Sequence, residues 1–171
     1  NVQIAGETID YGPCAFMDDF HPNTVFSSLD QNGRYAWVNQ PNIGVWNISR
    51  LAEALLPILD TDEDANVKLA EGAVEGFSAL FNDALNDGIA AKLGIAVDAA
   101  FMQTTFKVMT DHGCDFTLFF AELTRIAAGG SDDAFVALFV TPEPAQEWLE
   151  TWRGVYDAAL LDQMKMVNPV Y

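Results

Sequence analysis

Basic residues are scarce in this sequence, which has 8 Lys and Arg against 25 Asp and Glu and a formal net charge of −17. Such a chain repels the phosphates of nucleic acids and the headgroups of anionic membranes, so neither is expected as a partner. The sequence contains no apolar run long enough to span a bilayer and no signal-peptide pattern. Nucleic-acid binding and membrane insertion are therefore disfavoured.

Residues typical of metal or nucleophile chemistry are also rare. The two cysteines, Cys14 and Cys114, are expected to be buried free thiols rather than a disulfide. His21 and His112 stand alone, with no HExxH pattern and no zinc-ligand spacing around them. The acidic run at residues 60–64 lacks the glycine and the spacing of an EF-hand loop and is interpreted as a solvated helix start.

What is present is a large apolar fraction. Half of the 171 residues are hydrophobic and 12 are Phe, which indicates one folded domain with a real core. Apolar residues recur at three- and four-residue steps from Asn42 onward, so we predict a mainly α-helical fold with five or six helices. A small N-terminal β-hairpin precedes the helices, and a short strand is predicted at residues 35–38 after an Asn32-Gly33 turn.

The helix boundaries follow from caps and breakers. The predictions are, in chain order, a helix from about Asn42 ended or kinked by Pro57; a long helix capped by Asp60 or Thr61; a short segment set off by breaks at Gly88 and Gly94; a helix from about Asp98 to Asp111; a helix capped by Asp115 and closed by Gly129 and Gly130; a short helix capped by Ser131; and a final helix from Thr141-Pro142 through Met164, ended by Asn168-Pro169.

The first ten residues, NVQIAGETID, alternate in polarity around a central Ala-Gly pair, as in a β-hairpin with a two-residue turn. In that register Asn1 faces Asp10, and directly opposed residues have Cβ atoms roughly 5 Å apart. An amide oxygen and a carboxylate are ligands that hard divalent cations accept. The hairpin could therefore hold one cation, although a plain surface hairpin has the same pattern.

Asp10 is followed by Tyr11-Gly12, an order similar to the Asp-Phe-Gly of protein kinases, in which the Asp holds Mg²⁺.

Four blocks of the sequence carry a wider resemblance. They are IDYGPCAFMDDFHPN (residues 9–23), NGRYAWVNQPNIGVWNISRLAEALLP (32–57), DFTLFFAELTRIA (115–127) and MKMVNPVY (164–171). Together they resemble the selenoprotein O family, and the resemblance extends from the first residue to the last.

This resemblance implies a protein adenylyltransferase that transfers AMP from ATP to Ser, Thr or Tyr hydroxyls of proteins. It implies a kinase-like fold and a single partial domain, with a metal-site hairpin and activation-segment-like loop at residues 1–40 and a helical C-terminal lobe at 41–171. Asn1 and Asp10 match the family's metal-binding residues for Mg²⁺ or Mn²⁺. Phe26 stands where many relatives have a redox-active cysteine, so no redox switch is predicted.

The same resemblance places other family features outside these residues. The presumed general base precedes the residue that matches Asn1, and the glycine-rich nucleotide loop, its Lys and its Glu lie further upstream. We therefore expect an interior piece of a longer protein that is inactive alone. The expected location is cytoplasmic for a bacterial protein and mitochondrial for a eukaryotic one, and the apolar face of the hairpin could cause self-association.

Two other functions remain open at this stage. One is a helical protein-binding module that uses its acidic surface and the aromatic helix around Trp148, Trp152 and Tyr156. The other is ordinary kinase-type phosphoryl transfer in the intact chain, because the residues that orient ATP lie upstream.

Overall fold

The computed structural model describes residues 17–59 and 62–168, and these residues are mainly helical. The predicted hairpin, with Asn1 and Asp10, lies outside the described residues. Among the described residues there are seven α-helices, against five or six predicted, and no named strand. The helices are α1 (Gln40–Leu55), α2 (Glu63–Leu93), α3 (Ala99–His112), α4 (Phe116–Ala127), α5 (Asp133–Val136), α6 (Pro142–Val155) and α7 (Leu161–Val167). None of the described helices is long and apolar enough to cross a membrane.

The chain divides into two compact units. The described part of the first unit is residues 23–59 and 62–83, and that of the second is residues 17–22 and 84–168. Helix α2 begins in the first unit and ends in the second.

In the first unit, the predicted strand at residues 35–38 is wrong. The carboxylate of Asp30 accepts hydrogen bonds from the main-chain N–H groups of Arg34 and Tyr35, both at 2.8 Å. These bonds fold the segment into turns that lead into a 3₁₀-helix at Trp37–Asn39 and then into α1. The Asn32-Gly33 turn is present, and Gly33 has a positive φ of 62° that glycine adopts at low cost.

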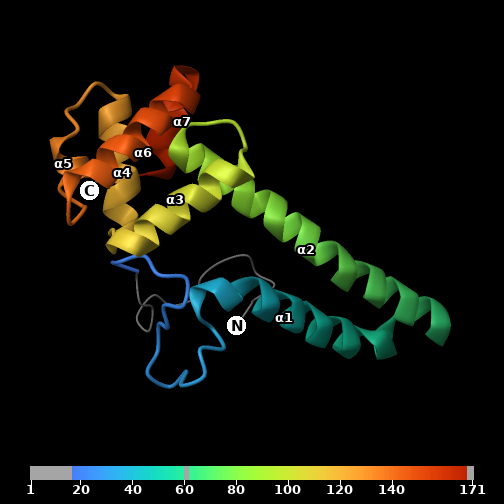
Figure 1. The fold of residues 1–171 in the computed structure, drawn as a ribbon. Helices are drawn as coiled ribbons and strands as arrows, with labels where there is room; N and C mark the ends of the chain where they lie inside the picture. Colours follow the sequence, from blue (N-terminus) through green and yellow to red (C-terminus); the bar gives the residue numbers. More distant parts are fainter. Residues whose placement is uncertain (1–16, 60–61, 169–171) are drawn as a thin grey trace. The chain divides into compact units, whose positions relative to one another are not determined.

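Helices α1 and the first part of α2 form a helical hairpin in this unit (Figure 1). Helix α1 ends at Leu55 and a 3₁₀-helix at Leu56–Ile58 contains Pro57, as the sequence predicts. The predicted cap residues Asp60 and Thr61 lie outside the described residues. The carboxylate of Asp62 accepts the main-chain N–H of Ala65 at 3.0 Å and supports the first turn of α2.

Helix α2 continues through Gly88 to Leu93, so the predicted interruption at Gly88 is wrong. A glycine in a helix interior costs only about 1 kcal/mol relative to Ala, which the burial of Ile89, Ala90 and Leu93 offsets. The predicted break at Gly94 is confirmed, since the helix ends at Leu93 and Gly94 has a φ of +65°.

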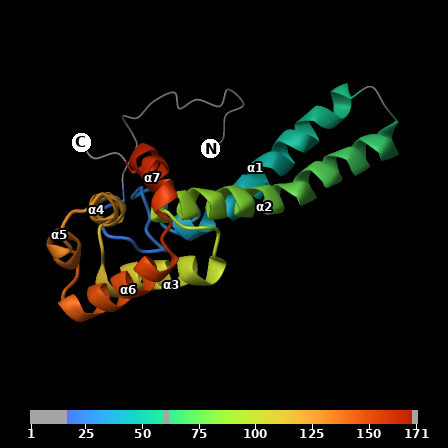
Figure 2. The ribbon, with the colours of Figure 1, turned by 90° about the horizontal axis from the view of Figure 1, so that it is seen from above.

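The second unit is built around aromatic side chains on α3, α4, α5 and α6. Phe119 is fully buried, and its ring lies 4.8 Å from that of Phe135 and 5.0 Å from that of Trp148. Helices α3 and α6 lie side by side (Figure 2), joined by the Trp148 indole N–H, which donates to the Thr105 hydroxyl at 3.3 Å. The predicted cap at Asp115 is confirmed, since its carboxylate accepts from the Leu118 N–H. Asp98, at the predicted start of α3, also caps its helix by accepting from the Phe101 N–H.

Two predictions for the C-terminal part need correction. The long helix expected from Thr141 through Met164 is broken after Val155, because Tyr156 pairs with Ile95 in a β-bridge and the Asp157 N–H donates to the Gly94 carbonyl at 2.9 Å. The chain then forms a 3₁₀-helix at Ala158–Leu160 and α7. Ser131 does not cap α5: its hydroxyl contacts the Asp133 side chain, and Asp132 is the N-cap residue.

Candidate functional site

The two predicted metal ligands, Asn1 and Asp10, lie outside the described residues, so their role stays a prediction. Within residues 17–59 and 62–168, no group of three or more His, Cys, Asp and Glu side chains is placed to hold a metal ion. The described segments that follow Asp10 most closely in the sequence are residues 17–22 and the loop before α1.

The segment at residues 17–22 is fixed to the second unit. The Phe20 N–H donates to the Cys114 carbonyl, and the Phe116 N–H donates to the Asp18 carbonyl, both at 2.8 Å. The Phe20 ring is 2% exposed and stacks at 5.2 Å on Phe106 and at 5.8 Å on Phe116. Two main-chain hydrogen bonds and a buried ring hold this segment, so it has few alternative positions. Phe20 therefore anchors residues 17–22 within the second unit.

The loop at residues 27–36 is held by polar side chains at the start of α1. The amide of Asn39 donates to the Gly33 carbonyl at 2.7 Å, and the amide of Gln40 donates to the Tyr35 carbonyl at 2.8 Å. The Arg34 guanidinium lies 4.7 Å from the centre of the Trp46 ring, within the range of a cation–π contact. Asn39 and Gln40, which lie in the block at residues 32–57, therefore hold the preceding loop in place.

Sequence reasoning did not predict these loop contacts. Asn39 and Gln40 stand directly before the proline that marks the helix start, and side-chain amides there can reach back to main-chain carbonyls. That position is the signal that could have identified them, although it does not indicate which carbonyls they contact.

A second polar cluster joins α2, α4 and the end of α7. The Lys92 ammonium donates to the Val167 carbonyl at 2.9 Å and to Asn168 Oδ1 at 3.0 Å. The Asn168 amide donates to the Lys92 carbonyl at 2.8 Å and to the Thr124 hydroxyl at 3.0 Å. Burial lowers the pKa of Lys92 below its usual range, because removing water disfavours the charged form. Asn168, which belongs to the MKMVNPVY block, therefore has a structural role.

The aromatic stripe on α6 belongs to the core. Trp148 is 4% exposed and Trp152 is 1% exposed, and the Trp152 indole N–H donates to the Leu93 carbonyl at 2.8 Å. A partner cannot reach these rings while the unit is folded. The hypothesis of a binding module that presents Trp148 and Trp152 is therefore wrong.

Comparison with known proteins gives the family directly. The family model described as protein adenylyltransferase SelO matches residues 1–169. The protein nucleotidyltransferase YdiU of Bradyrhizobium sp. (strain BTAi1 / ATCC BAA-1182) is 48% identical over 185 residues, and that of Rhodopseudomonas palustris (strain HaA2) is 46% identical over 182 residues. Each alignment covers 100% of this chain and 37% of the relative, so the chain spans little more than a third of the length of these curated relatives.

A further relative, the protein nucleotidyltransferase YdiU of Mycobacterium sp. (strain KMS), is 46% identical over 177 residues, again over 100% of this chain and 36% of its own length. The match therefore includes the segments anchored at Phe20, Asn39 and Asn168 as well as the residues before them. This chain belongs to the SelO family of protein adenylyltransferases.

Proposed function

We propose that this chain is part of a protein adenylyltransferase that, as a whole protein, transfers AMP from ATP to Ser, Thr or Tyr hydroxyls of other proteins. The observation that carries the proposal is the family match over residues 1–169, which includes the residues resembling the family's metal-binding pair. The nucleotidyltransferase names of relatives at 40–48% identity support the same reaction class.

In this reaction the oxygen of the acceptor hydroxyl forms a bond to the α-phosphorus of ATP. The bond between that phosphorus and the oxygen bridging to the β-phosphorus breaks, and pyrophosphate leaves with the electron pair. The hydroxyl proton passes to a general base, which the family resemblance places outside this chain. The product is a protein phosphodiester, and neither oxidation nor reduction occurs.

Asn1 and Asp10 are the residues of this chain that would hold Mg²⁺ or Mn²⁺ in the proposed function. An amide oxygen and a carboxylate suit these cations, which prefer oxygen ligands and keep several water or phosphate ligands. When bound, such an ion would neutralise the charge that develops on the phosphate oxygens.

We also propose that the fold is a kinase-like C-terminal lobe, in which the anchor at Phe20 steadies the segment after Asp10.

Labelled ATP tests the proposal on the full-length protein. With a generic protein acceptor and Mg²⁺ present, label at the α-phosphate is expected to appear on protein, and label at the γ-phosphate is expected to leave with pyrophosphate. Transfer of the γ-label instead would show kinase-type chemistry and overturn the proposal. The 171-residue chain by itself is expected to transfer neither label.

A further inference from the structure

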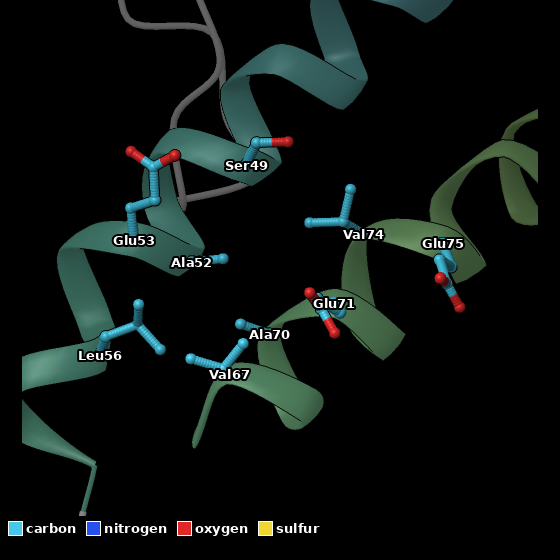
Figure 3. A pocket seen from close by; sticks show the side chains of 9 residues that line it. All are labelled: Ser49, Ala52, Glu53, Leu56, Val67, Ala70, Glu71, Val74 and Glu75. Carbon is cyan, nitrogen blue, oxygen red and sulfur yellow. The ribbon is translucent and has the colours of Figure 1, made fainter. Parts of the chain in front are cut away.

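Helix α1, the turn after it and the first part of α2 enclose a groove of about 470 Å³ within the first unit (Figure 3). Leu56 and Ala52 point across the groove toward Val67, Ala70 and Val74 (Figure 3). The remaining lining residues are polar or charged: Ser49, Glu53, Glu71 and Glu75. Its volume lies within the roughly 300–1,000 Å³ typical of binding pockets.

The groove exists because small side chains face one another. Ala52 and Ala70 leave space between the helices, whereas Gly44 and Phe77 make a close approach in the same unit, at the other end of α1. A second hollow of about 380 Å³ shares Leu56 and Val67 with the groove. Apolar side chains remain exposed around it, with Val67 at 38% and Ile58 at 74%. Covering such a surface would be favourable, because apolar area is removed from water.

The charged residues that line the groove are acidic. Glu53, Glu71 and Glu75 are exposed, and no Lys or Arg is among the lining residues. Glu53 is already paired with Arg50, so the negative charge offered to a partner is that of Glu71 and Glu75. Glu71 and Glu75 are four residues apart on α2, a spacing at which like charges destabilise a helix. A cation placed between them would relieve that repulsion, so the surface is complementary to a basic, partly apolar segment.

A second copy of this chain does not supply such a segment. The eight Lys and Arg residues are scattered, and the nearest two, Arg153 and Lys165, are twelve positions apart. Five of the eight are in ion pairs within the chain: Arg50, Lys107, Arg125, Arg153 and Lys165. Two molecules with a net charge of −17 each also repel one another.

We propose that the α1–α2 groove is a docking site for a segment of a partner protein that carries neighbouring Lys or Arg residues beside an apolar stripe. The apolar stripe would cover Ala52, Leu56 and Val74, and the basic residues would meet Glu71 and Glu75. This is recognition of an amphipathic helix in a groove, with charge at the rim fixing the register. The proposal depends on the groove and not on the transfer reaction.

Fluorescence anisotropy with a labelled synthetic peptide tests the proposal. The probe is an amphipathic peptide about four helical turns long, with Leu at helical spacing on one face and Lys and Arg on the other. We expect it to bind the chain, to bind less at high salt, and to bind less when its Lys and Arg are replaced by Glu. Absence of binding at low salt would overturn the proposal.

Two groove variants locate the binding. The double variant Glu71→Gln/Glu75→Gln is expected to bind the peptide roughly fivefold more weakly, since each exposed ion pair contributes only modestly to the affinity. Ala70→Met, which fills the groove, is expected to weaken binding further, and circular dichroism would verify that it folds. The matched control Glu147→Gln/Glu150→Gln removes the same charge from α6 and is expected to retain binding.

The other outcomes each contradict the proposal. Equal weakening by the α2 and α6 double variants would show non-specific attraction to an acidic protein. A dimer in sedimentation experiments that Ala70→Met dissociates would make a second copy the occupant. If the full-length protein does not bind a peptide that this chain binds, the rest of the polypeptide covers the groove.

Discussion

Cys114 illustrates at the scale of one residue how position determines chemistry. It is a fully buried free thiol at the junction between α3 and α4, as the sequence predicts for a core cysteine. Burial raises the pKa of Cys114 to about 12, and the nearby Asp19 carboxylate adds to the shift. The thiolate is the reactive form of cysteine, so this residue is unsuited to nucleophilic or redox chemistry in the folded protein.

Thiol labelling at pH 8 should show this directly. In a Cys14→Ser variant, which leaves Cys114 as the single thiol, we expect no reaction in the folded protein and full reaction in denaturant. The pKa of Cys114 in the folded protein lies above the ordinary value of 9.0. The protonated Cys114 thiol therefore makes its full contribution to the stability of the fold below about pH 9, and this contribution is lost as the pH rises toward 12. Equal labelling rates in the folded and denatured protein would contradict this account.

Asn168 is a residue whose importance the sequence does not reveal. It is 4% exposed, and it joins Lys92 to Thr124 by hydrogen bonds in both directions. Asn168→Ala should lower the free energy of unfolding by about 1 to 3 kcal/mol, because buried donors and acceptors lose their partners. Thermal or urea unfolding measures the effect, with the exposed Asn82→Ala on α2 as control. A loss no larger than that of the control would show that the cluster contributes little.

At the scale of elements, local signals predicted most helices and failed where distant residues intervene. Asp115 caps a helix as predicted, and α3 begins beside Asp98 as predicted, because a capping carboxylate needs only the N–H groups two or three residues ahead. The break after Val155 was missed, because it depends on the pairing of Tyr156 with Ile95, which is remote in sequence. The strand predicted at residues 35–38 failed because Asp30 binds the N–H groups that a strand would have used.

Glycines on the α1–α2 hairpin should respond in opposite ways to the same substitution. A Cβ atom on Gly44 would lie 2.5 Å from Phe77 Cζ, so Gly44→Ala should destabilise the chain despite a gain in helix propensity, by up to about 2 kcal/mol. Nothing lies within 4 Å of a Cβ on Gly76, so Gly76→Ala should stabilise it by about 0.5 to 1 kcal/mol. Denaturant unfolding compares them, and stabilisation by both would show that α1 and α2 do not pack at this point.

At the scale of the whole molecule, the blocks that carry the family resemblance contain residues that hold the fold together. Phe20, Asn39 and Asn168 lie in three blocks that carry the resemblance, and in the structure each holds a segment in place. Sequence comparison identified these blocks without indicating which residues are structural. The candidate metal pair, Asn1 and Asp10, stays a prediction from the hairpin register and the family resemblance, because both residues lie outside the described ones. The α1–α2 groove could not be predicted, because it depends on which small side chains face one another.

The central claim is that Asn1 and Asp10 hold the metal ion for AMP transfer, and side-chain variants of the full-length protein test it most directly. The matched control is Asp18→Asn, because Asp18 is exposed and its hydrogen bond to Phe116 uses the main-chain carbonyl. The measurement is transfer of α-labelled AMP to protein at several Mg²⁺ concentrations. We expect Asp10→Asn and Asn1→Ala to lose transfer by at least about 100-fold, while Asp18→Asn retains it. Transfer by Asp10→Asn at the level of Asp18→Asn would contradict the account.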